Sequence, residues 1–370
     1  MKKNLVLVGG GHAHMVTLAN LDKFIKRGHQ VTVIGPSEHH YYSGMGPGML
    51  SKTYRPSEIR FATRQVVEKK GGKFILDKVV RIDPAAKQIF LENGDPLPYD
   101  VLSFNAGSYV PQSSISGKDK DIFSVKPIEK LMAAQARIIE LLAKKDLSVG
   151  IVGGGPSAAE VAGNIWQLAK DRGNHTVKIR IFAGLRFMSR FPDNIRKTAI
   201  EIMRQREIEI IEQGYVKEVK TGLVTLENDE SWRLDIIFLA LGVKPSLIFK
   251  DSGLPIGPDG GLLVNRYLQC PDFPEIFGGG DCIYFKEQPL DKVGVYAVRE
   301  NPILYQNLMA TLEGAALTPF DPGGDYLLIF NMGGKIGIFR KRRLMFSGRL
   351  AFTIKDYIDR RFMRKFQAIE

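Results

Sequence analysis

The 370-residue sequence contains only two cysteines, Cys270 and Cys282, and no CxxC motif. This scarcity argues against a disulfide framework and against a cysteine-based zinc site, and it is typical of proteins from a reducing compartment. We expect both cysteines to be small buried apolar side chains rather than redox thiols.

Long apolar runs are also missing. No segment of 18 apolar residues occurs, so we expect no membrane-spanning helix. The apolar run at 5–8 ends at Gly9-Gly10-Gly11, which makes it too short for the hydrophobic part of a signal peptide. The sequence therefore predicts a cytoplasmic protein whose first apolar run is a buried strand.

Negative charge is scarce relative to positive charge, with 40 Asp and Glu against 52 Lys and Arg and a net charge of +12. Between Arg340 and Glu370, ten Lys and Arg face three acids, a net charge of +7. A partner that binds the excess positive charge would therefore bind this tail. No nucleic-acid recognition motif accompanies the charge, so we expect no nucleic acid to bind.

Residues 5–34 have the pattern of a βαβ unit that binds a dinucleotide. A strand at 5–8 leads into Gly9-Gly10-Gly11, a helix is expected to continue through Leu21, and the next strand is expected at 30–34. Glycines let the backbone approach a pyrophosphate, and the helix N-terminus stabilises the negative charge.

Two positions depart from the dinucleotide fingerprint. His14 takes the place of the third glycine, and Gly35 takes the place of the carboxylate that binds the adenosine ribose. Glu38, three residues further on, is the substitute that we predict for this carboxylate.

Histidines in two pairs, at His12 and His14 and at His39-His40, raise the question of a metal site. No cysteine or carboxylate cluster completes a ligand set. We therefore predict no metal, and expect the imidazoles to be polar groups near phosphate or packing spacers.

Two further segments allow a close approach to a ligand. Residues 41–49 are rich in Gly and Pro and predict an irregular loop, in which Gly44 and its neighbours would lie against a flat ring; an ordinary Gly/Pro loop is the alternative. A strand ending at Phe104 runs into Ala106-Gly107, where the backbone can again approach a ligand closely.

The opening pattern occurs again 144 residues later. After a helix expected at 128–145, a strand at 148–152 leads into Gly153-Gly154-Gly155-Pro156-Ser157-Ala158, a second Gly-x-Gly-x-x-Ala turn before a helix. Two such units predict two dinucleotide-binding domains far more specifically than one does.

The second unit again lacks the ribose-binding carboxylate, because Phe182 ends the strand at 177–182. Arg186 and Arg190 follow and would meet a 2′-phosphate, which favours NADPH; solvated surface charges are the alternative. Glu160, in the first turn of the second helix, stabilises the helix N-terminus in one interpretation. In the other it faces the nicotinamide or relays a proton, and it is our candidate catalytic residue.

Residues 277–282 read Phe-Gly-Gly-Gly-Asp-Cys and follow an apolar strand end. The Asp281 carboxylate can accept hydrogen bonds from sugar-like hydroxyls. A phosphate-binding turn at one end of the chain and this aspartate far downstream suit a long cofactor such as flavin adenine dinucleotide (FAD). A helix predicted to start at Gly294-Val295-Tyr296 would direct its first amides at the flavin.

The tail predicts a hairpin with strands at 326–330 and 335–339, then a helix from about 347 to 366. Leu350, Ile354, Ile358, Phe362 and Phe366 recur every fourth residue, interleaved with basic residues. This helix either lies on an anionic membrane surface or packs on its own protein or on a second subunit of a homodimer.

The two dinucleotide turns and the late Gly-Asp resemble the flavoproteins with two dinucleotide-binding domains, over residues 1 to about 310. Within that group the chain resembles type II NADH:quinone and sulfide:quinone oxidoreductases. Residues 9–14, 42–48 and 297–299 are most similar to the NADH dehydrogenase-like module fused ahead of selenide, water dikinase, although no kinase portion is present.

The resemblance implies an α/β fold with two Rossmann-like domains. An FAD domain would comprise 1–120 and 240–322, an inserted NAD(P) domain 121–239, and a small C-terminal region 323–370. The expected FAD-binding residues are Gly9, Gly11, His12, Ala13, Glu38, Gly44, Ala106, Gly107, Gly280, Asp281, Val295 and Tyr296. The expected nicotinamide-nucleotide residues are Gly153, Gly155, Ser157, Glu160, Arg186 and Gly242.

The implied activity is hydride transfer from NADH or NADPH to FAD and on to a quinone or another small acceptor. Quinone-reducing relatives carry glutamines around 295–300, where this chain has Val295 and Arg299. Two alternatives therefore stay open: a flavin-bearing module that serves a protein partner, and a quinone reductase that oxidises sulfide or a selenium species.

Overall fold

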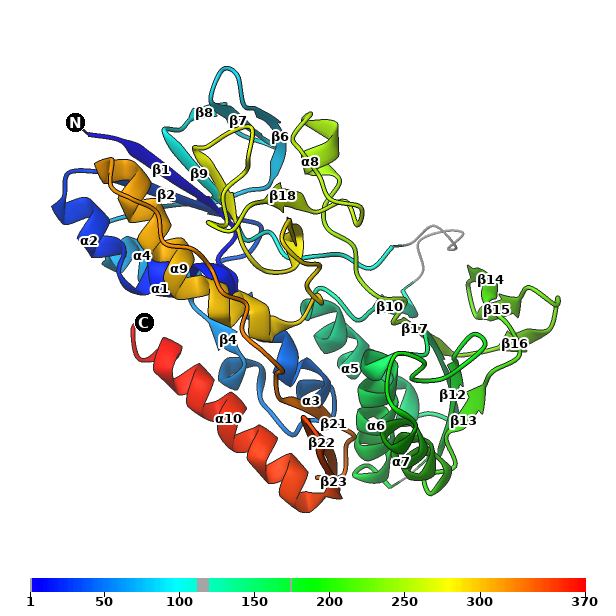
Figure 1. Cartoon of the computed structure of the whole chain (residues 1–370). Coiled ribbons are helices and arrows are strands. Elements are labelled where there is room, and N and C mark those ends of the chain that lie inside the picture. Colours follow the sequence, from blue (N-terminus) through cyan, green and yellow to red (C-terminus); the bar gives the residue numbers. More distant parts are fainter. Residues whose placement is uncertain (1, 112–119, 174) are drawn as a thin grey trace.

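Two five-stranded parallel sheets form the core of the protein, which is described here by a computed structural model covering residues 2–111, 120–173 and 175–370 (Figure 1). Each sheet has helices packed on it and its own apolar core. This confirms the predicted α/β class with two Rossmann-like domains.

The first sheet has the order β19-β9-β1-β2-β5. Its strands are β1 (Asn4–Val8), β2 (Gln30–Gly35), β5 (Lys73–Leu76), β9 (Val101–Phe104) and β19 (Ile276–Gly278). The chain continues from β1 to one side and returns on the other, so the strand order reverses between β1 and β9. Ligands of such sheets bind at the carboxyl ends of the strands at this point.

The helix after β1 is interrupted, contrary to the prediction of one helix through Leu21. A short 3-10 turn, η1 (His12–His14), leads into α1 (Met15–Ala19), and α2 (Leu21–Lys26) follows after a break at Asn20. The Asn20 side chain donates a hydrogen bond to the Val16 carbonyl at 2.8 Å. Asparagine side chains compete with the helical backbone in this way, which accounts for the break.

The Gly/Pro segment at 41–49 is partly helical, which corrects the loop prediction. After β3 (His40–Tyr41) come η2 (Ser43–Met45) and α3 (Gly46–Leu50), with Pro47 in the first turn of α3, where its missing N–H has no cost. A Cβ at Gly46 would lie 2.7 Å from the Ile128 side chain, so the glycine permits close helix packing.

The second sheet has the order β10-β17-β11-β12-β13 and reverses between β11 and β17. Its strands are β10 (Ile122–Ser124), β11 (Leu147–Val152), β12 (Val177–Phe182), β13 (Glu209–Ile211) and β17 (Ile236–Leu239). Its helices are α5 (Glu129–Leu142), α6 (Pro156–Lys170) and α7 (Asp193–Arg204). The strand and helix positions agree with those predicted for the second dinucleotide unit.

Smaller elements surround the two sheets (Figure 1). Antiparallel sheets are formed by β6 (Val79–Asp83), β7 (Gln88–Leu91) and β8 (Leu97–Pro98), and by β14 (Val216–Lys220), β15 (Leu223–Leu226) and β16 (Ser231–Arg233). The other elements are η3 (Pro56–Glu58), β4 (Arg60–Phe61), α4 (Thr63–Lys69), α8 (Ile248–Asp251), β18 (Leu262–Val264), η4 (Gly280–Cys282), β20 (Ile283–Phe285) and α9 (Gly294–Glu313).

The C-terminal region is a three-stranded antiparallel sheet followed by a long helix. It comprises β21 (Leu328–Asn331), β22 (Gly337–Lys341), β23 (Leu344–Gly348) and α10 (Arg349–Gln367). The predicted hairpin is present, but the third strand was missed, because the basic residues before it make a second tight turn. Figure 1 shows this sheet between α10 and the helices α6 and α7.

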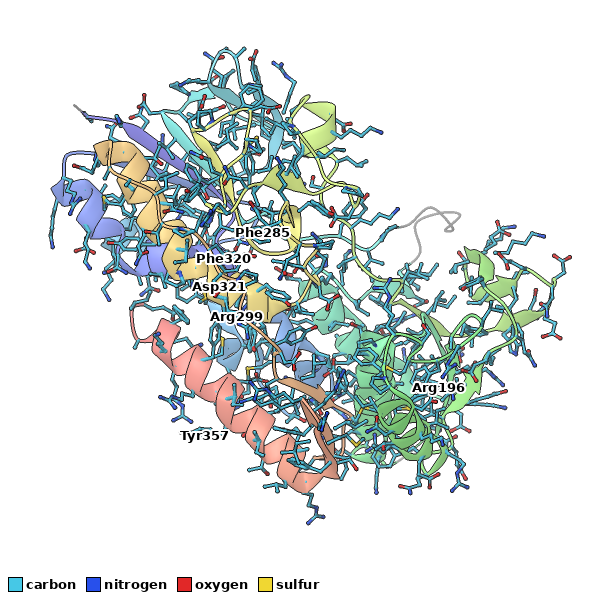
Figure 2. All side chains as sticks on the ribbon, viewed as in Figure 1. Arg196, Phe285, Arg299, Phe320, Asp321 and Tyr357 are labelled. Carbon is cyan, nitrogen blue, oxygen red and sulfur yellow. The ribbon has the colours of Figure 1, made fainter. Side chains whose placement is uncertain are left out.

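The docked face of α10 differs from the predicted apolar stripe. The buried positions are Ala351, Phe352, Lys355, Asp359, Met363 and Phe366. Leu350, Tyr357 and Ile358 are instead exposed, by 64%, 60% and 41% (Figure 2 labels Tyr357). A buried ion pair between Lys355 and Asp359, described below, turns this face of the helix inward. Hydrophobic spacing therefore predicted Phe362 and Phe366 on the inward face correctly, but not the positions around Lys355.

Two glycines allow the C-terminal sheet to dock on α6. A Cβ at Gly163 would lie 1.9 Å from the Met332 carbonyl oxygen, and one at Gly333 would lie 2.1 Å from the Gly163 carbonyl oxygen. The Arg206 guanidinium also donates to the Met332 and Gly333 carbonyls. Backbone thus packs on backbone where α6 meets the turn after β21.

Gly163→Ala should loosen this junction. In an unconstrained helix the change would stabilise by about 1 kcal/mol, but overpacking here should cost about 1–3 kcal/mol or more. We expect a lower thermal midpoint and faster proteolysis near residue 330. Gly324→Ala is the matched control, since a Cβ there meets nothing within 4 Å. An unchanged or raised midpoint for Gly163→Ala would show that the docking is loose.

Candidate functional site

The side chain of Asn105 joins the three glycine-rich segments of the first sheet. Its Oδ1 accepts a hydrogen bond from the Ala13 N–H at 3.1 Å, and its Nδ2 donates to the Gly279 carbonyl at 2.7 Å. Gly9 and Gly11 lie so close to this residue that a Cβ at either would be 2.3 or 2.2 Å from an Asn105 oxygen. The turn after β1 and the turn after β19 are therefore held at a fixed separation.

His14 occupies the place of the third fingerprint glycine and is fully buried. Its Nδ1 lies 2.6 Å from the Gly9 carbonyl and its Nε2 lies 2.8 Å from the Ser103 hydroxyl. A neutral ring that donates from Nδ1 and accepts at Nε2 satisfies both contacts. Burial lowers the pKa of His14 to about 4, which keeps it neutral. The interpretation of His14 as a packing spacer fits this geometry.

Asp281 lies at the start of the turn after β19, beside the residues that follow β9. Its Oδ2 accepts hydrogen bonds from the Ser108 hydroxyl and the Lys126 ammonium, both at 2.8 Å. Burial alone would raise the pKa of Asp281, but Lys126 and Ser108 together lower it below its usual value. The carboxylate is thus ionised and held at the carboxyl end of the sheet, as an acceptor for ligand hydroxyls must be.

Glu300, on α9, contacts the same turn after β19. Its buried carboxylate accepts a hydrogen bond from the Gly280 N–H, and burial raises its pKa to about 7. Neighbouring Cys282 is also buried, with its Sγ 3.3 Å from the Gly279 carbonyl, and burial raises the pKa of the thiol to about 12. Such a thiol is not a nucleophile at neutral pH.

Open space adjoins this framework at two glycines. A Cβ at Gly107 (φ 67°) or at Gly294 would meet no atom within 4 Å. Ala106 is exposed next to Gly107, and Val295 and Tyr296 are partly exposed in the first turn of α9. The buried Nε2 of His12 has no hydrogen-bond partner in the described residues, so a polar ligand group would satisfy it.

The second dinucleotide turn has the same construction. Gly153 (φ 135°) lies where a Cβ would be 2.2 Å from the Ala240 carbonyl oxygen, so β11 and β17 close together there. Gly155 and Gly242 face open space, since a Cβ at either position would meet no atom within 4 Å, and Ser157 is exposed in the first turn of α6. The turn is therefore open at these positions.

Two predicted site residues, Glu38 and Arg186, and the nearby Arg299 make contacts that the sequence did not indicate. The Glu38 carboxylate accepts a hydrogen bond from Arg64 at 2.6 Å on the surface. Arg186 pairs with Asp193, the first residue of α7. Arg299 of α9 donates to the carbonyls of Pro322 and Gly324, and Figure 2 shows it beside this segment at Asp321.

His12 and His40 form the centre of an aromatic cluster. The Nδ1 of His12 and the Nε2 of His40 lie 3.2 Å apart. The His12 ring packs on Tyr42 and Phe362 with centroid distances of 5.1 and 5.4 Å. Burial lowers the pKa of His12 to about 3 and that of His40 to about 4. The described residues contain no group of three metal-binding side chains around these rings.

A second cluster, which we call the Lys355 cluster, comprises Tyr42, Glu160, Lys355 and Asp359. The Lys355 ammonium donates to Asp359 Oδ2 at 2.7 Å and to the Gly44 carbonyl at 2.9 Å, and the Tyr42 hydroxyl donates to Asp359 Oδ1 at 3.0 Å. Its members come from the first domain, from α6 and from α10.

Glu160 faces this cluster rather than only the amides of its own helix. Its Oε1 accepts a hydrogen bond from the Asn331 N–H at 2.7 Å. Burial raises the pKa of Glu160 to about 7, although Lys355 acts in the opposite direction. A carboxyl group that titrates near neutral pH can donate or accept a proton under physiological conditions.

Several residues of the site were missed by sequence reasoning: Asn105, Ser108, Lys126, Glu300, Lys355 and Asp359. Lys355 and Asp359 interrupt the predicted apolar face of the tail helix, and charges at i and i+4 on such a face are a signal that could have found them. Lys126 comes from a segment that no motif marks, and only folding brings it to Asp281. Glu300 lies within the 295–300 segment, but its contact with Gly280 also arises only on folding.

A family model described as "Pyridine nucleotide-disulphide oxidoreductase" matches residues 3–309. The chain is 23% identical to the type II NADH:quinone oxidoreductase of Staphylococcus saprophyticus, over all of this chain and 97% of that protein. It is 24% identical to ferroptosis suppressor protein 1 of Taeniopygia guttata, over 96% of this chain and 92% of that protein.

Solved structures share the fold over the whole chain. The structure of NDH2 from Plasmodium falciparum in complex with NADH matches with a TM-score of 0.81 and 17% identity, covering 100% of this chain and 97% of that one. The sulfide:quinone oxidoreductase from Aquifex aeolicus matches with a TM-score of 0.80 and 18% identity, covering 100% and 92%.

Asn105→Ala should destabilise the first domain and weaken flavin retention. The change leaves the Ala13 N–H and the Gly279 carbonyl without partners in a buried site, at about 1–3 kcal/mol each. We expect a lower thermal midpoint and a lower ratio of flavin to protein, measured by absorbance after gel filtration. Exposed Asn228→Ala is the control. Full flavin content at wild-type stability would mean that Asn105 does not hold the turns.

Proposed function

Because the chain belongs to the pyridine nucleotide-disulphide oxidoreductase family, whose model matches residues 3–309, we propose that it is an FAD-dependent NAD(P)H dehydrogenase. Its acceptor in this proposal is a quinone or a similar small molecule. The observation that carries the proposal is the pair of dinucleotide turns at the reversal points of two parallel sheets, with the ionised Asp281 beside the first.

On the first sheet, Gly9, Gly11 and Ala13 would receive the pyrophosphate of FAD, with the ribose near Glu38. Asp281 would accept hydrogen bonds from the ribityl hydroxyls, and the first amides of α9 at Val295 and Tyr296 would face the pyrimidine edge of the ring. Bound FAD supplies the hydride acceptance and electron delivery, and the protein aligns the reactants and excludes water.

On the second sheet, Gly153, Gly155 and Ser157 would receive the pyrophosphate of the nicotinamide nucleotide, and Gly242 would leave room for its approach to the flavin. NADH is the donor that we favour, because Arg186 forms a surface ion pair with Asp193 that would compete with a 2′-phosphate. The P. falciparum structure with NADH supports the same donor.

The Lys355 cluster is our candidate for the acceptor side of the reaction. Glu160 Oε1 is bonded to the Asn331 amide, which leaves Oε2 as the oxygen that would carry a proton. Tyr42 and Lys355 lie on the same network and would orient a polar acceptor. Glu160 therefore combines an enclosed position with a pKa of about 7, the properties that a proton donor to a reduced acceptor requires.

We further propose a peripheral association with anionic membrane, where a lipophilic quinone would be found. The outward face of α10 combines exposed Leu350, Tyr357 and Ile358 with Arg361 and Arg364. Apolar side chains among basic ones are typical of helices that lie in a membrane interface. None of the helices in the described residues combines the length and apolar composition that crossing a bilayer requires. A homodimer that covers the same face is the competing arrangement.

Two alternatives stay in view. Val295 and Arg299, in place of glutamines, favour a module that holds flavin for a protein partner and turns over slowly. Oxidation of sulfide or a selenium species, as the resemblance to the selenide-linked module implies, would have to proceed without the two thiols, since Cys270 and Cys282 are both buried. Replacing both cysteines by alanine without loss of activity would exclude a thiol relay.

Anaerobic mixing of the purified flavoprotein with NADH or NADPH tests the proposal directly. We expect the flavin absorbance to bleach rapidly with NADH and more slowly with NADPH, and to recover when a quinone is added. Bound flavin that bleaches with neither nucleotide would overturn the dehydrogenase and favour the partner module. Bleaching without recovery would retain the donor and exclude quinone as the acceptor.

Glu160→Gln should slow turnover with quinone by at least about 10-fold, since a positioned proton donor contributes about 10²–10⁴-fold. Wild-type turnover should fall as the pH rises through about 7, the pKa of Glu160, and the variant should lack this fall. Steady-state rates from pH 5.5 to 8.5 provide the measurement, with exposed Glu227→Gln as the control.

Thermal unfolding of the same variant checks the pKa itself. The folded pKa of Glu160 lies above the ordinary value of 4.5, so its protonated form stabilises the wild type at low pH and this contribution is lost as the pH rises through 7. The midpoint of Glu160→Gln should therefore rise relative to wild type between pH 5 and 8. An unchanged rate with this shift present would remove Glu160 from the mechanism but leave its environment as described.

A further inference from the structure

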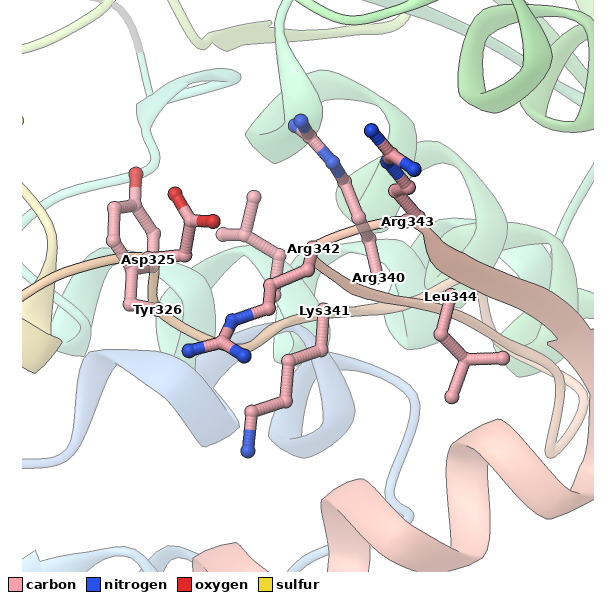
Figure 3. Close-up of a pocket in the computed structure, with 8 residues that line it drawn as sticks. Asp325, Tyr326, Arg340, Lys341, Arg342, Arg343 and Leu344 are labelled. Atoms are coloured by element: carbon pink, nitrogen blue, oxygen red, sulfur yellow. The ribbon is translucent and has the colours of Figure 1, made fainter.

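The hairpin that joins β22 to β23 carries four consecutive cations at its tip. These residues help to line an open cavity of about 690 Å³ in the C-terminal region (Figure 3). We call this cavity the basic pocket; its lining residues are Asp325, Tyr326, Leu328, Arg340, Lys341, Arg342, Arg343 and Leu344. None of them belongs to the dinucleotide turns or to the Lys355 cluster.

Unpaired positive charge dominates the basic pocket. In the part of the chain that the structure describes, none of the four cationic side chains forms an ion pair or a hydrogen bond, and Asp325 is the one acid among the residues of the pocket. Like charges this close repel one another, which raises the free energy of the empty pocket. A multivalent anion would convert this repulsion into attraction.

The backbone at the tip of the hairpin is strained at Arg342. Arg342 has a φ of 53°, in the left-handed region, and occupies a two-residue hairpin turn where glycine or asparagine is favoured. A side chain in this conformation costs on the order of 1 kcal/mol.

The strand register divides the cations between two directions. Figure 3 shows Arg340 and Arg343 pointing the same way as the Tyr326 side chain, while Lys341 and Leu344, a register pair, point the other way. Guanidinium groups offer planar forks of N–H donors, which match the oxygens of a phosphate group. A carboxylate would leave most of these donors unused.

The position of the basic pocket places it next to the first domain. The Tyr326 hydroxyl donates to Asp291 Oδ2 at 2.8 Å, and its ring lies 5.5 Å from the ring of Tyr296, in the first turn of α9. A ligand in the pocket would thus lie beside the helix start that we assign to the flavin, without occupying either dinucleotide turn.

We propose that the basic pocket is a binding site for a phosphate-bearing anion, held by the guanidinium groups of Arg340 and Arg343. The phosphate belongs either to the headgroup of an anionic phospholipid or to a soluble phosphate compound. The exposed Leu344 (59%) points with Lys341 away from these two arginines, so the two probes below decide between the sources.

The experiment compares two probes on the flavin-loaded, full-length protein at fixed ionic strength. One is inorganic pyrophosphate, followed by calorimetry; the other is vesicles with phosphatidylglycerol, against pure phosphatidylcholine vesicles, followed by co-sedimentation. We expect Arg340→Gln/Arg343→Gln to weaken binding of the responsive probe at least 10-fold. Pyrophosphate that binds at the second dinucleotide turn would be unaffected by this double variant.

Two single variants separate binding from folding. Arg342→Gly removes a cation and relieves the positive φ, so it should bind more weakly while its thermal midpoint is equal or higher. Lys335→Gly, also exposed and at φ 58° but in the turn at the opposite end of the sheet, should bind like wild type. NADH oxidation with a water-soluble acceptor should be unchanged in all of them.

The outcomes are distinct. Loss of vesicle binding in the double variant, without a pyrophosphate effect, identifies a lipid headgroup. Loss of pyrophosphate binding identifies a soluble phosphate compound. The proposal is overturned if neither probe binds to wild type, or if wild type and the double variant bind both probes equally.

Discussion

The amide side chain of Asn105 is the contact on which the first site depends. It bonds to the turn after β1 and to the turn after β19, which are more than 260 residues apart in the chain. A buried amide can satisfy two partners only at one geometry, so it sets the spacing between the turn after β1 and Asp281. The glycines around it are required because any Cβ would collide with Asn105 itself. The hydrogen bonds of Asn105 within the protein therefore fix the geometry of the cofactor site before any cofactor binds.

The Lys355 cluster fixes how larger parts of the molecule pack together, as Asn105 does for the two turns. Buried charges are costly unless paired, and Lys355 and Asp359 are paired with each other and bonded to Gly44 and Tyr42. This network orients α10 against the first domain, while Gly163 and Gly333 let the C-terminal sheet pack on α6. Glu160 lies where these parts meet, and burial there raises its pKa. The packing that docks α10 on the first domain is therefore also the packing that raises the pKa of Glu160 towards neutral pH.

Glycine spacing and strand periodicity predicted both dinucleotide units well, because the turn after a parallel strand is a local structure with strict steric demands. The prediction was weaker where local rules compete. Asn20 breaks the first helix through its own side chain, and Pro47 starts a helix inside a segment that composition marks as a loop. In the tail, Phe362 and Phe366 of the predicted stripe pack inward, but Leu350 and Ile358 are exposed, because the buried ion pair of Lys355 and Asp359 lies on the inward face there.

The sequence by itself determined the α/β class, the two dinucleotide turns and the presence of Asp281, since each follows from residues close together in the chain. Tertiary structure alone decided what surrounds them: Lys126 and Ser108 at Asp281, Glu300 at Gly280, and Lys355 near Glu160. It also decided that four basic residues at a hairpin tip line one pocket. Ionisation, burial and charge balance depend on neighbours from distant segments, and no local pattern records those neighbours.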